Sequence, residues 1–434
     1  MKVLLVKPSF PYPYSRGEFT YNRIFPPLDL VNCAAVLESA GHKVKILDAH
    51  ALRIKPEKIK KSAGGFDKIF ITSSALDRWQ CPNIDISPFL DAVNYLREAN
   101  NELYITGYHG TAEPEAILQT TKARAVILGE PEYSVLDICS KNDLSSARGI
   151  CYKDGDKVVM TAKQEPVKMN KLPVPAFHLL DFNRYSYEIL GRRLSLFEIS
   201  RGCRFNCSFC NKVMYGDGLR VKSKEQIMLE VSTAVEKYRV ESAYFMDLDF
   251  LSDKKTAEEL CDYLIEKEYK FQWACQARAD LLDEAMLGKM QNSGCRIIHL
   301  GVESGTQGLL DGINKGITVE KMKKAVRMCK EAGIKTLAFY LFGLPDETKA
   351  HRKKAFSFMR ELDTDFISLH RVIPYKGSRI KQTDYQCQED IDRFIRGAML
   401  RYYLRPSYLF RLSPFVLSRG LKLLWGRINS LLKP

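Results

Sequence analysis

Three cysteines lie close together near the middle of the sequence. Cys203, Cys207 and Cys210 are separated by three and by two residues. One short loop can direct all three sulfurs inward, and thiolates are the ligands that hold iron–sulfur clusters, so this spacing predicts a [4Fe-4S] site. Three ligands leave one iron of a four-iron cubane open to a small molecule. Zinc is the alternative, because zinc ribbons also use Cys-x2-Cys pairs.

The other cysteines do not form a second motif. No further Cys-x2-Cys pair and no paired histidine motif follows the cluster segment, which disfavours a zinc ribbon. We expect the remaining thiols to be reduced, because no secretory signal precedes them. They are at positions 33, 81, 139, 151, 261, 275, 295, 329 and 387.

The cysteine segment follows the first of six predicted strands, each separated from the next by a helical pattern. This alternation indicates an α/β fold with a partial (β/α)6 barrel, in which functional groups lie on the loops after the strands. The predicted strands are 196–199, 243–245, 271–275, 297–302, 335–342 and 366–369.

An earlier βα series precedes the barrel. Five short apolar runs with helical patterns between them indicate an N-terminal doubly wound parallel sheet, whose ligands bind at the carboxyl ends of the strands. Its predicted strands are 3–6, 44–47, 69–71, 103–105 and 125–128. We therefore expect four parts: the sheet domain (1–140), a hairpin and linker (141–194), the barrel (195–375) and a basic helical C-terminal region (376–434).

Composition restricts the class of protein and locates its charge. The 434 residues are 45% hydrophobic and 27% charged, as expected for a globular chain of more than one domain. Without an eighteen-residue apolar stretch or a signal peptide, the chain is expected in the cytoplasm. The formal charge is +14, and after Asp392 there are nine Lys or Arg and no acidic residue.

The basic tail has three interpretations. The segment after Phe415 shows apolar residues at spacings of three and four, which predicts an amphipathic helix. It could pack on the barrel, or it could make a peripheral contact with an anionic membrane, with Trp425 and the leucines inserted. Nucleic acid is the least supported partner, because no RNA-binding motif accompanies the charge.

Cys-x3-Cys-x2-Cys after the first strand of such a barrel resembles the radical S-adenosylmethionine (radical SAM) enzymes. The preceding α/β domain resembles the subgroup with an N-terminal cobalamin-binding domain. The resemblance covers nearly the whole chain, and further motifs carry it: Pro26-Pro27-Leu28-Asp29-Leu30, Ala40-Gly41-His42-Lys43-Val44, Thr106-Gly107-Tyr108-His109-Gly110-Thr111, Ala277-Arg278-Ala279-Asp280, Gly301-Val302-Glu303-Ser304-Gly305, Lys315-Gly316 and Phe342-Gly343-Leu344-Pro345-Asp346-Glu347-Thr348.

The resemblance implies that the three cysteines ligate the cluster and that SAM chelates the fourth iron. One electron from an external donor then cleaves SAM to a 5′-deoxyadenosyl radical. Phe209 is where the family places an aromatic ring against adenine, with a loop-core role as the alternative. Gly343 and Pro345 would shape the loop near adenine.

Charged residues at the strand ends are the other expected SAM contacts. Arg278 has the fork to hold the SAM carboxylate, and Glu303, followed by Ser304, could accept hydrogen bonds from the ribose hydroxyls or the methionyl amine. The alternative for Arg278 and Glu303 is a salt bridge inside the barrel. Asp247 and Asp249 hold similar positions after the second barrel strand.

The expected cobalamin contacts lie on the strand-end loops 9–14, 73–80, 107–111 and 129–133. Ser74, Gly107, His109 and Gly129 are the candidates, since glycine lets the backbone approach a bulky ligand. The Asp-x-His-x-x-Gly motif that supplies a histidine to cobalt is missing, because Arg53 follows Asp48-Ala49-His50 where glycine is required. His50 is therefore not expected to ligate cobalt.

These features predict a cobalamin-dependent radical SAM enzyme that methylates an unactivated carbon of a small molecule. The alternatives are a radical rearrangement, cyclisation or carbon–carbon bond formation without methylation, and a metal-containing protein that binds RNA or membrane. A tail suited to membranes would fit a lipid or isoprenoid substrate. No residue is identified as a catalytic acid, base or nucleophile.

Overall fold

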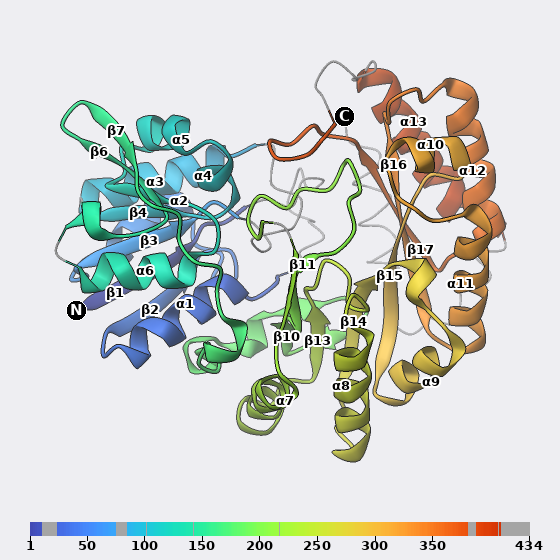
Figure 1. Ribbon diagram of the computed structural model, residues 1–434, viewed down its shortest axis with the longest axis horizontal. Helices are drawn as coiled ribbons and strands as arrows, with labels where there is room; N and C mark the ends of the chain where they lie inside the picture. Colours follow the sequence, from blue (N-terminus) through green and yellow to red (C-terminus); the bar gives the residue numbers. More distant parts are fainter. Residues whose placement is uncertain are drawn as a thin grey trace.

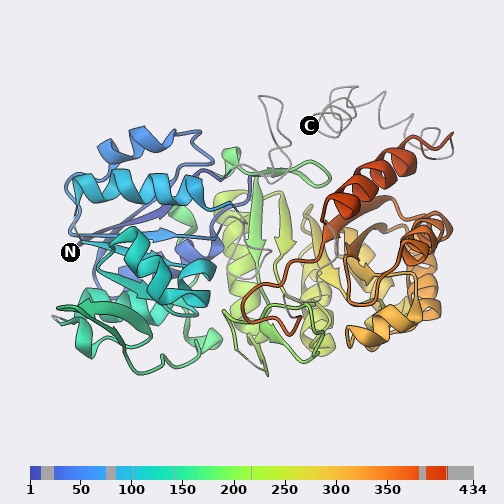
Figure 2. The same ribbon diagram turned by 90° about the horizontal axis from the view of Figure 1, so that it is seen from above.

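The computed structural model describes residues 1–10, 24–74, 85–100, 102–141, 143–216, 218–380, 388–406 and 408. Two α/β units lie side by side (Figures 1 and 2). The N-terminal unit is built on one mainly parallel sheet, and the C-terminal unit is an open barrel of parallel strands.

Within the described residues, the N-terminal sheet has seven strands in the order β2-β1-β3-β4-β5-β6-β7. Neighbours from β2 to β5 are parallel, and β6 and β7 extend the sheet as an antiparallel hairpin. The bounds are β1 (Lys2–Lys7), β2 (Lys43–Asp48), β3 (Lys68–Thr72), β4 (Leu103–Thr106), β5 (Ala125–Ile127), β6 (Ile150–Asp154) and β7 (Lys157–Met160).

Helices cover both faces of this sheet. Val3 and Leu5 of β1 belong to one apolar cluster, and Leu4 and Val6 belong to another, because successive side chains of a strand point to opposite faces. The first cluster includes α1 and α6, and the second includes α3 and α5. The helices are α1 (Leu28–Ser39), α2 (Pro56–Ile59), α3 (Ser87–Ala99), α4 (Tyr108–Ala112), α5 (Pro114–Thr121) and α6 (Pro131–Ser140).

In the same described part of the chain, six parallel strands form the barrel in the order β10-β13-β14-β15-β16-β17. Most of its helices begin at a Ser, Thr or Asp whose side chain accepts a backbone N–H three residues further on. The strands are β10 (Leu194–Phe197), β13 (Ser242–Phe245), β14 (Gln272–Ala277), β15 (Cys295–Glu303), β16 (Lys335–Phe342) and β17 (Phe366–Arg371). The helices are α7 (Lys224–Ser232), α8 (Lys254–Glu266), α9 (Glu284–Asn292), α10 (Gln307–Gly312), α11 (Val319–Glu331), α12 (Lys349–Leu362) and α13 (Gln388–Tyr403).

Two local features differ from the sequence prediction. The hairpin expected in the linker is β6–β7, and it belongs to the N-terminal sheet because Val126 of β5 pairs with Cys151. The segment 196–199 is not one strand. β10 ends at Phe197, and a separate hairpin of β11 (Ser200–Cys203) and β12 (Gly218–Val221) follows.

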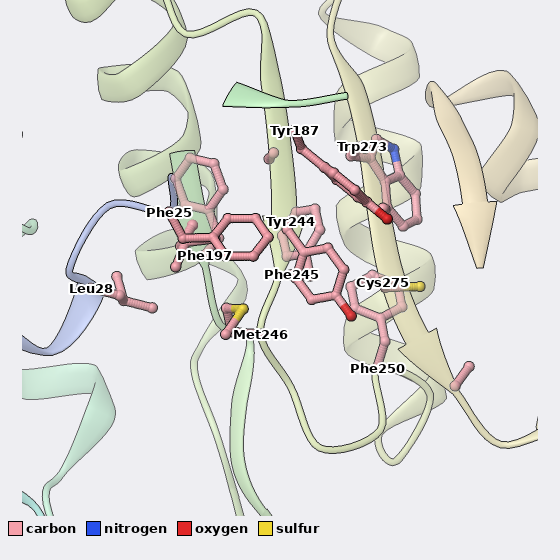
Figure 3. Packing of buried hydrophobic residues seen from close by; sticks show 14 of the residues in the cluster. Phe25, Leu28, Tyr187, Phe197, Tyr244, Phe245, Met246, Phe250, Trp273 and Cys275 are labelled. Atoms are coloured by element: carbon pink, nitrogen blue, oxygen red, sulfur yellow. The ribbon is translucent and has the colours of Figure 1, made fainter. Parts of the chain in front are cut away.

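One apolar core joins the two units. The cluster that covers β1 continues through Phe25 and Leu28 to Tyr187, Phe197 and Tyr244 (Figure 3). Tyr187 lies in a small hairpin of the linker, formed by β8 (Ser186–Tyr187) and β9 (Gly191–Arg192). This shared core fixes the sheet against the barrel.

The predicted amphipathic helix after Phe415 lies outside the described residues, so its role stays a prediction. Among the helices that the structure describes, none combines the length and the apolar character that a membrane crossing requires.

Candidate functional site

The cysteine segment begins on the hairpin β11–β12. Cys203 ends β11 and pairs with Gly218. Gly202 has a φ of 88°, and a Cβ there would lie 2.1 Å from the carbonyl oxygen of Gly218. Only glycine suits this position, because both the positive φ and the close backbone exclude a side chain. The hairpin thus sets where the loop of the three cysteines, residues 203–210, begins.

The three cysteines lie in one loop at the top of the barrel. Cys203 is buried, and Cys207 and Cys210 are half-buried. Burial, followed by the charges of Cys207 and Cys203, raises the pKa of Cys210 to about 12. In the described part of the chain, no three His, Cys, Asp or Glu side chains converge as for a single metal ion. Three thiols on one loop fit a cubane, whose irons each take their own ligand.

Backbone contacts hold this cysteine loop from several sides. Lys212 Nζ donates to the carbonyl oxygens of Phe205 and, at 2.9 Å, of Cys203. The Ser208 N–H donates to the Ile313 carbonyl at 2.9 Å, and the Ser208 carbonyl accepts from Arg379 N–H at 2.8 Å. A residue just after the loop and two segments far along the chain therefore fix its path.

Arg278 lies beside the loop, where β14 ends. Its Nη1 is 3.9 Å from Cys207 Sγ, and its guanidinium carbon stacks 3.7 Å from the centroid of Phe205. One side of the guanidinium also binds Asp280, with Nε 3.0 Å from Oδ1 and Nη2 3.1 Å from Oδ2. The expected salt-bridge alternative is thus present, and the SAM carboxylate role stays a prediction.

Glu303 forms a buried ion pair with Lys315, whose Nζ lies 2.8 Å from Oε1. Burial would lower the pKa of Lys315, but the Glu303 carboxylate outweighs it and the pKa is raised. Glu303 has a φ of 62° next to a register shift in β15, a strained conformation of the kind that collects at functional sites. Gly301 leaves room for the pair, because a Cβ there would lie 2.5 Å from Glu303 Oε1 and 2.7 Å from Lys315 Nζ.

The expected adenine-site residues gather near this pair. Lys315 Nζ lies 5.6 Å from the ring centroid of Phe209, which also packs against an apolar cluster that contains Leu344. Gly343, with a φ of 84°, and Leu344 both donate backbone N–H groups to the Glu347 carboxylate. Pro345 is half-buried in the same turn. Ser304 is buried directly after Glu303, and its Oγ accepts the N–H of Thr306 at 3.2 Å.

The two aspartates after β13 hold the backbone around the cysteine loop. Asp247 accepts N–H groups of Ile199 and Ser200 and the Ser200 hydroxyl, which ties the end of β13 to the start of β11. Burial raises the pKa of Asp247 to about 7, despite these hydrogen bonds. Asp249 accepts Arg278 N–H at 3.1 Å. The carboxylates of both aspartates thus accept hydrogen bonds from nearby backbone N–H groups, and a direct SAM contact of Asp247 stays a prediction.

The expected cobalamin contacts share one edge of the N-terminal sheet, at the ends of β3, β4 and β5. Ser74 Oγ accepts Tyr108 N–H at 3.1 Å, and His109 Nδ1 lies 3.1 Å from the Ser73 carbonyl. Gly107 has a φ of 95°, and a Cβ there would meet Ser74 Oγ at 2.7 Å. The described parts of the loops 9–14 and 73–80 end at Phe10 and Ser74, and the rest lies outside the described residues.

This sheet edge faces the cysteine loop of the barrel. A Cβ on Gly129 would lie 3.4 Å from the carbonyl oxygen of Met214, which follows the cysteines. Tyr108 donates to the carbonyl oxygen of Lys376 at 3.1 Å, and Lys376 forms an ion pair with Glu113 at 2.8 Å. Figure 1 shows the segment that contains Lys376, in orange-red, running from β17 toward α4. Both sets of candidate cofactor residues therefore face one junction.

Several residues of this site could not be recognised from the sequence. Phe205 and Lys212 lie within or just after the cysteine segment, and Asp280 follows Arg278 closely, but nothing in their spacing indicates their partners. Lys315 was visible as part of Lys315-Gly316, while its ion pair with Glu303 appears only in the fold.

Comparison with known proteins agrees with this architecture. Residues 197–359 match the family model of the radical SAM superfamily. An uncharacterized methyltransferase of Pyrococcus horikoshii is 26% identical, over 97% of each chain. The anaerobic magnesium-protoporphyrin IX monomethyl ester cyclase of Rubrivivax gelatinosus is 25% identical, over 88% of this chain and 70% of that protein.

Among solved structures, the radical S-adenosylmethionine methyltransferase TsrM of Kitasatospora setae has a similar fold. With tryptophan and a SAM analogue bound, it aligns with a TM-score of 0.69 and 18% identity, over 87% of this chain and 75% of that chain. At this identity the likeness establishes the shared fold.

The open barrel and its Cys-x3-Cys-x2-Cys loop define a radical SAM domain. The match to the family model covers residues 197–359, and the two-domain fold of the chain is similar to that of TsrM.

Proposed function

We propose that this protein is a cobalamin-dependent radical SAM methyltransferase that acts on an unactivated carbon of a small molecule. The observation that carries the proposal is the junction, where the Gly129 loop of the N-terminal sheet meets Met214, close behind the cysteine loop. A methyl carrier held by the sheet and SAM held by the barrel would thus face each other across one space. The relative from Pyrococcus horikoshii, a methyltransferase by name that matches over 97% of each chain, supports the same reaction class.

When bound, the cluster supplies the electron for reductive cleavage of SAM, and cobalamin supplies a carrier for the methyl group. Cys203, Cys207 and Cys210 would hold the cluster. Arg278, stacked on Phe205 beside Cys207, would place positive charge next to the SAM carboxylate.

The Glu303–Lys315 pair would orient the amino and ribose groups of SAM. Its two charges neutralise each other in a buried site, so the pair can present hydrogen-bonding atoms without adding net charge. Phe209, Ser304, Gly343 and Pro345 would enclose the adenine end, and Asp247 would act on SAM through the backbone that it holds. An external one-electron donor completes the system.

On the opposite side of the junction, cobalamin would lie against Ser74, Gly107, His109 and Gly129. The shared fold with TsrM supports this placement, since one of its structures holds cobalamin and a [4Fe-4S] cluster. His50 is not proposed as a cobalt ligand, because the Asp-x-His-x-x-Gly motif is missing. In the structure its Nδ1 lies 3.5 Å from Ser9 Oγ.

Labelled SAM tests the methyltransferase assignment. Anaerobically reconstituted protein is incubated with a reductant, cobalamin, candidate substrates and SAM that carries a deuterated methyl group. We expect 5′-deoxyadenosine, S-adenosylhomocysteine and a product with the labelled methyl. A substrate converted with release of 5′-deoxyadenosine but without label in the product would contradict the assignment.

Radical cyclisation is the second candidate, because the cyclase of Rubrivivax gelatinosus matches most of this chain at nearly the same identity. The same experiment separates the two functions, since a cyclase product carries no labelled methyl. For a lipid or isoprenoid substrate, co-sedimentation with anionic vesicles, with and without residues 409–434, would report whether the tail binds membranes.

A further inference from the structure

A buried group of charges lies between the N-terminal sheet and the cysteine hairpin. Arg201 of β11 and Arg220 of β12 are cross-strand neighbours in the hairpin. The carboxylate of Glu130, which follows β5, bridges them: Oε1 lies 2.7 Å from Arg201 Nη1 and Oε2 lies 2.8 Å from Arg220 Nη1. Each oxygen of one sheet-domain carboxylate thus binds one arginine of the barrel hairpin.

Further partners surround the same guanidinium. Glu132 Oε1 lies 2.8 Å and Glu198 Oε1 lies 2.6 Å from Arg201 Nη2. The linker joins as well, since Val167 N–H donates to Glu130 Oε2 at 3.1 Å. The side chain of Arg201 is 0% exposed, and those of Glu132 and Glu198 are 0% and 1% exposed.

Stability alone is a weak reason for such a group. Removing charges from water is costly, and a buried ion pair can often be replaced by apolar residues without loss of stability. The charges do define the position of the sheet domain relative to the hairpin. A carboxylate that bridges two guanidinium groups can bind both of them in only one geometry.

That position joins the two candidate cofactor sites. Glu130 directly follows Gly129, an expected cobalamin contact, and Arg201 is two residues before Cys203. The Glu130 carboxylate and the Arg201 guanidinium therefore form one short connection from one cofactor loop to the other.

We propose that Glu130 is a positioning residue that sets the distance and angle between the cobalamin edge of the sheet and the cluster loop. The inference rests on the proposed function and deepens it, because methyl transfer between the two sites depends on their relative placement. Cleavage of SAM at the cluster depends on the barrel alone and needs no such alignment.

The test compares Glu130→Gln with Glu230→Gln. Glu230 is a matched control because it forms a similarly buried ion pair at 2.8 Å, with Lys222, entirely within the barrel. We expect Glu130→Gln to lower transfer of labelled methyl from SAM to bound cobalamin about tenfold or more, since misplacement by about 1 Å can cost about a hundredfold. Release of 5′-deoxyadenosine should stay within about twofold of wild type. Glu230→Gln should preserve the ratio of the two rates.

A second readout needs neither cofactor nor activity. In cofactor-free protein, Glu130→Gln should speed deuterium exchange of the β11–β12 amides and of the β5–α6 amides together, whereas Glu230→Gln should leave the β5–α6 amides unchanged. If Glu130→Gln does not fold, Arg220→Met removes one arm at a half-exposed site and should shift both readouts in the same direction.

A parallel fall of methyl transfer and SAM cleavage in Glu130→Gln would overturn the inference. The inference would also be overturned if the β11–β12 and β5–α6 amides of Glu130→Gln exchanged deuterium at the wild-type rate. If wild type transfers no methyl to cobalamin, the proposed function fails, and the exchange measurement still decides whether Glu130 fixes the junction.

Discussion

Replacing Lys315 by Met tests whether the Glu303–Lys315 pair supports the site. The substitution keeps an unbranched side chain but leaves Glu303 buried without its partner at 2.8 Å. Both side chains are less than 10% exposed, at 7% and 6%, so solvent screening is small. Removing one partner of a buried pair costs about 3–5 kcal/mol, and we expect a loss of that size in the free energy of unfolding. Because the folded pKa of Lys315 is raised, the contribution is fully present at neutral pH and is lost only as the pH rises through that raised value.

Urea unfolding of the cofactor-free protein measures this loss. Trp273 is fully buried in β14, so its fluorescence in a Trp79→Phe, Trp425→Phe background reports the barrel. Lys330→Met is the control. It removes an ion pair with Asp363 whose side chains are 39% and 32% exposed, and after screening by solvent it should cost no more than about 1 kcal/mol. The double variant Lys315→Met, Glu303→Gln should recover part of the loss. The reasoning would be refuted if Lys315→Met lowered the free energy of unfolding by no more than Lys330→Met does. It would also be refuted if the losses of Lys315→Met and Glu303→Gln simply added in the double variant.

Three further perturbations test the loop. Cys207→Ala should prevent reconstitution of a four-iron cluster while the barrel still folds. Bound iron and visible absorbance measure the cluster, and circular dichroism measures folding. Gly202→Ala should destabilise the hairpin by at least about 1–2 kcal/mol, the cost of a left-handed φ, since its Cβ also meets the Gly218 carbonyl; equal unfolding midpoints would contradict this. Asp247 has a pKa raised to about 7, while an unfolded Asp titrates near about 4. The native state therefore binds more protons between these values, and wild-type stability relative to Asp247→Asn should fall as the pH rises through that window.

The fold could largely be predicted from local patterns. Apolar runs that alternate with helical segments identify each barrel strand to within a few residues, because burial on both faces requires continuous apolar residues. The cysteine loop could also be predicted, because its three ligands lie within eight residues and their spacing is visible without any long-range information.

Partners that the fold brings together could not be predicted in this way. Glu130 and Arg201 are 71 residues apart, and Glu303 and Lys315 are on separate elements. A charged residue at a strand end looks the same in sequence whether it binds SAM, as expected for Arg278, or a neighbour such as Asp280. The end of β10 at Phe197, inside the predicted strand 196–199, could not be predicted because Asp247, far along the chain, supplies the hydrogen bonds that hold Ile199 and Ser200.

The contacts at the junction favour a rigid placement of the two units over a hinge. The core that contains Phe25, Tyr187 and Tyr244 is continuous from sheet to barrel, and the side chains of the Glu130–Arg201 bridge are almost fully buried, at 7% and 0% exposed. Opening this interface would expose the apolar core and separate buried charges at once, which is far more costly than moving a surface loop. Substrate entry is therefore expected to involve the segments over the junction, such as the one anchored by Lys376, whose ion pair with Glu113 is solvent-exposed and weak.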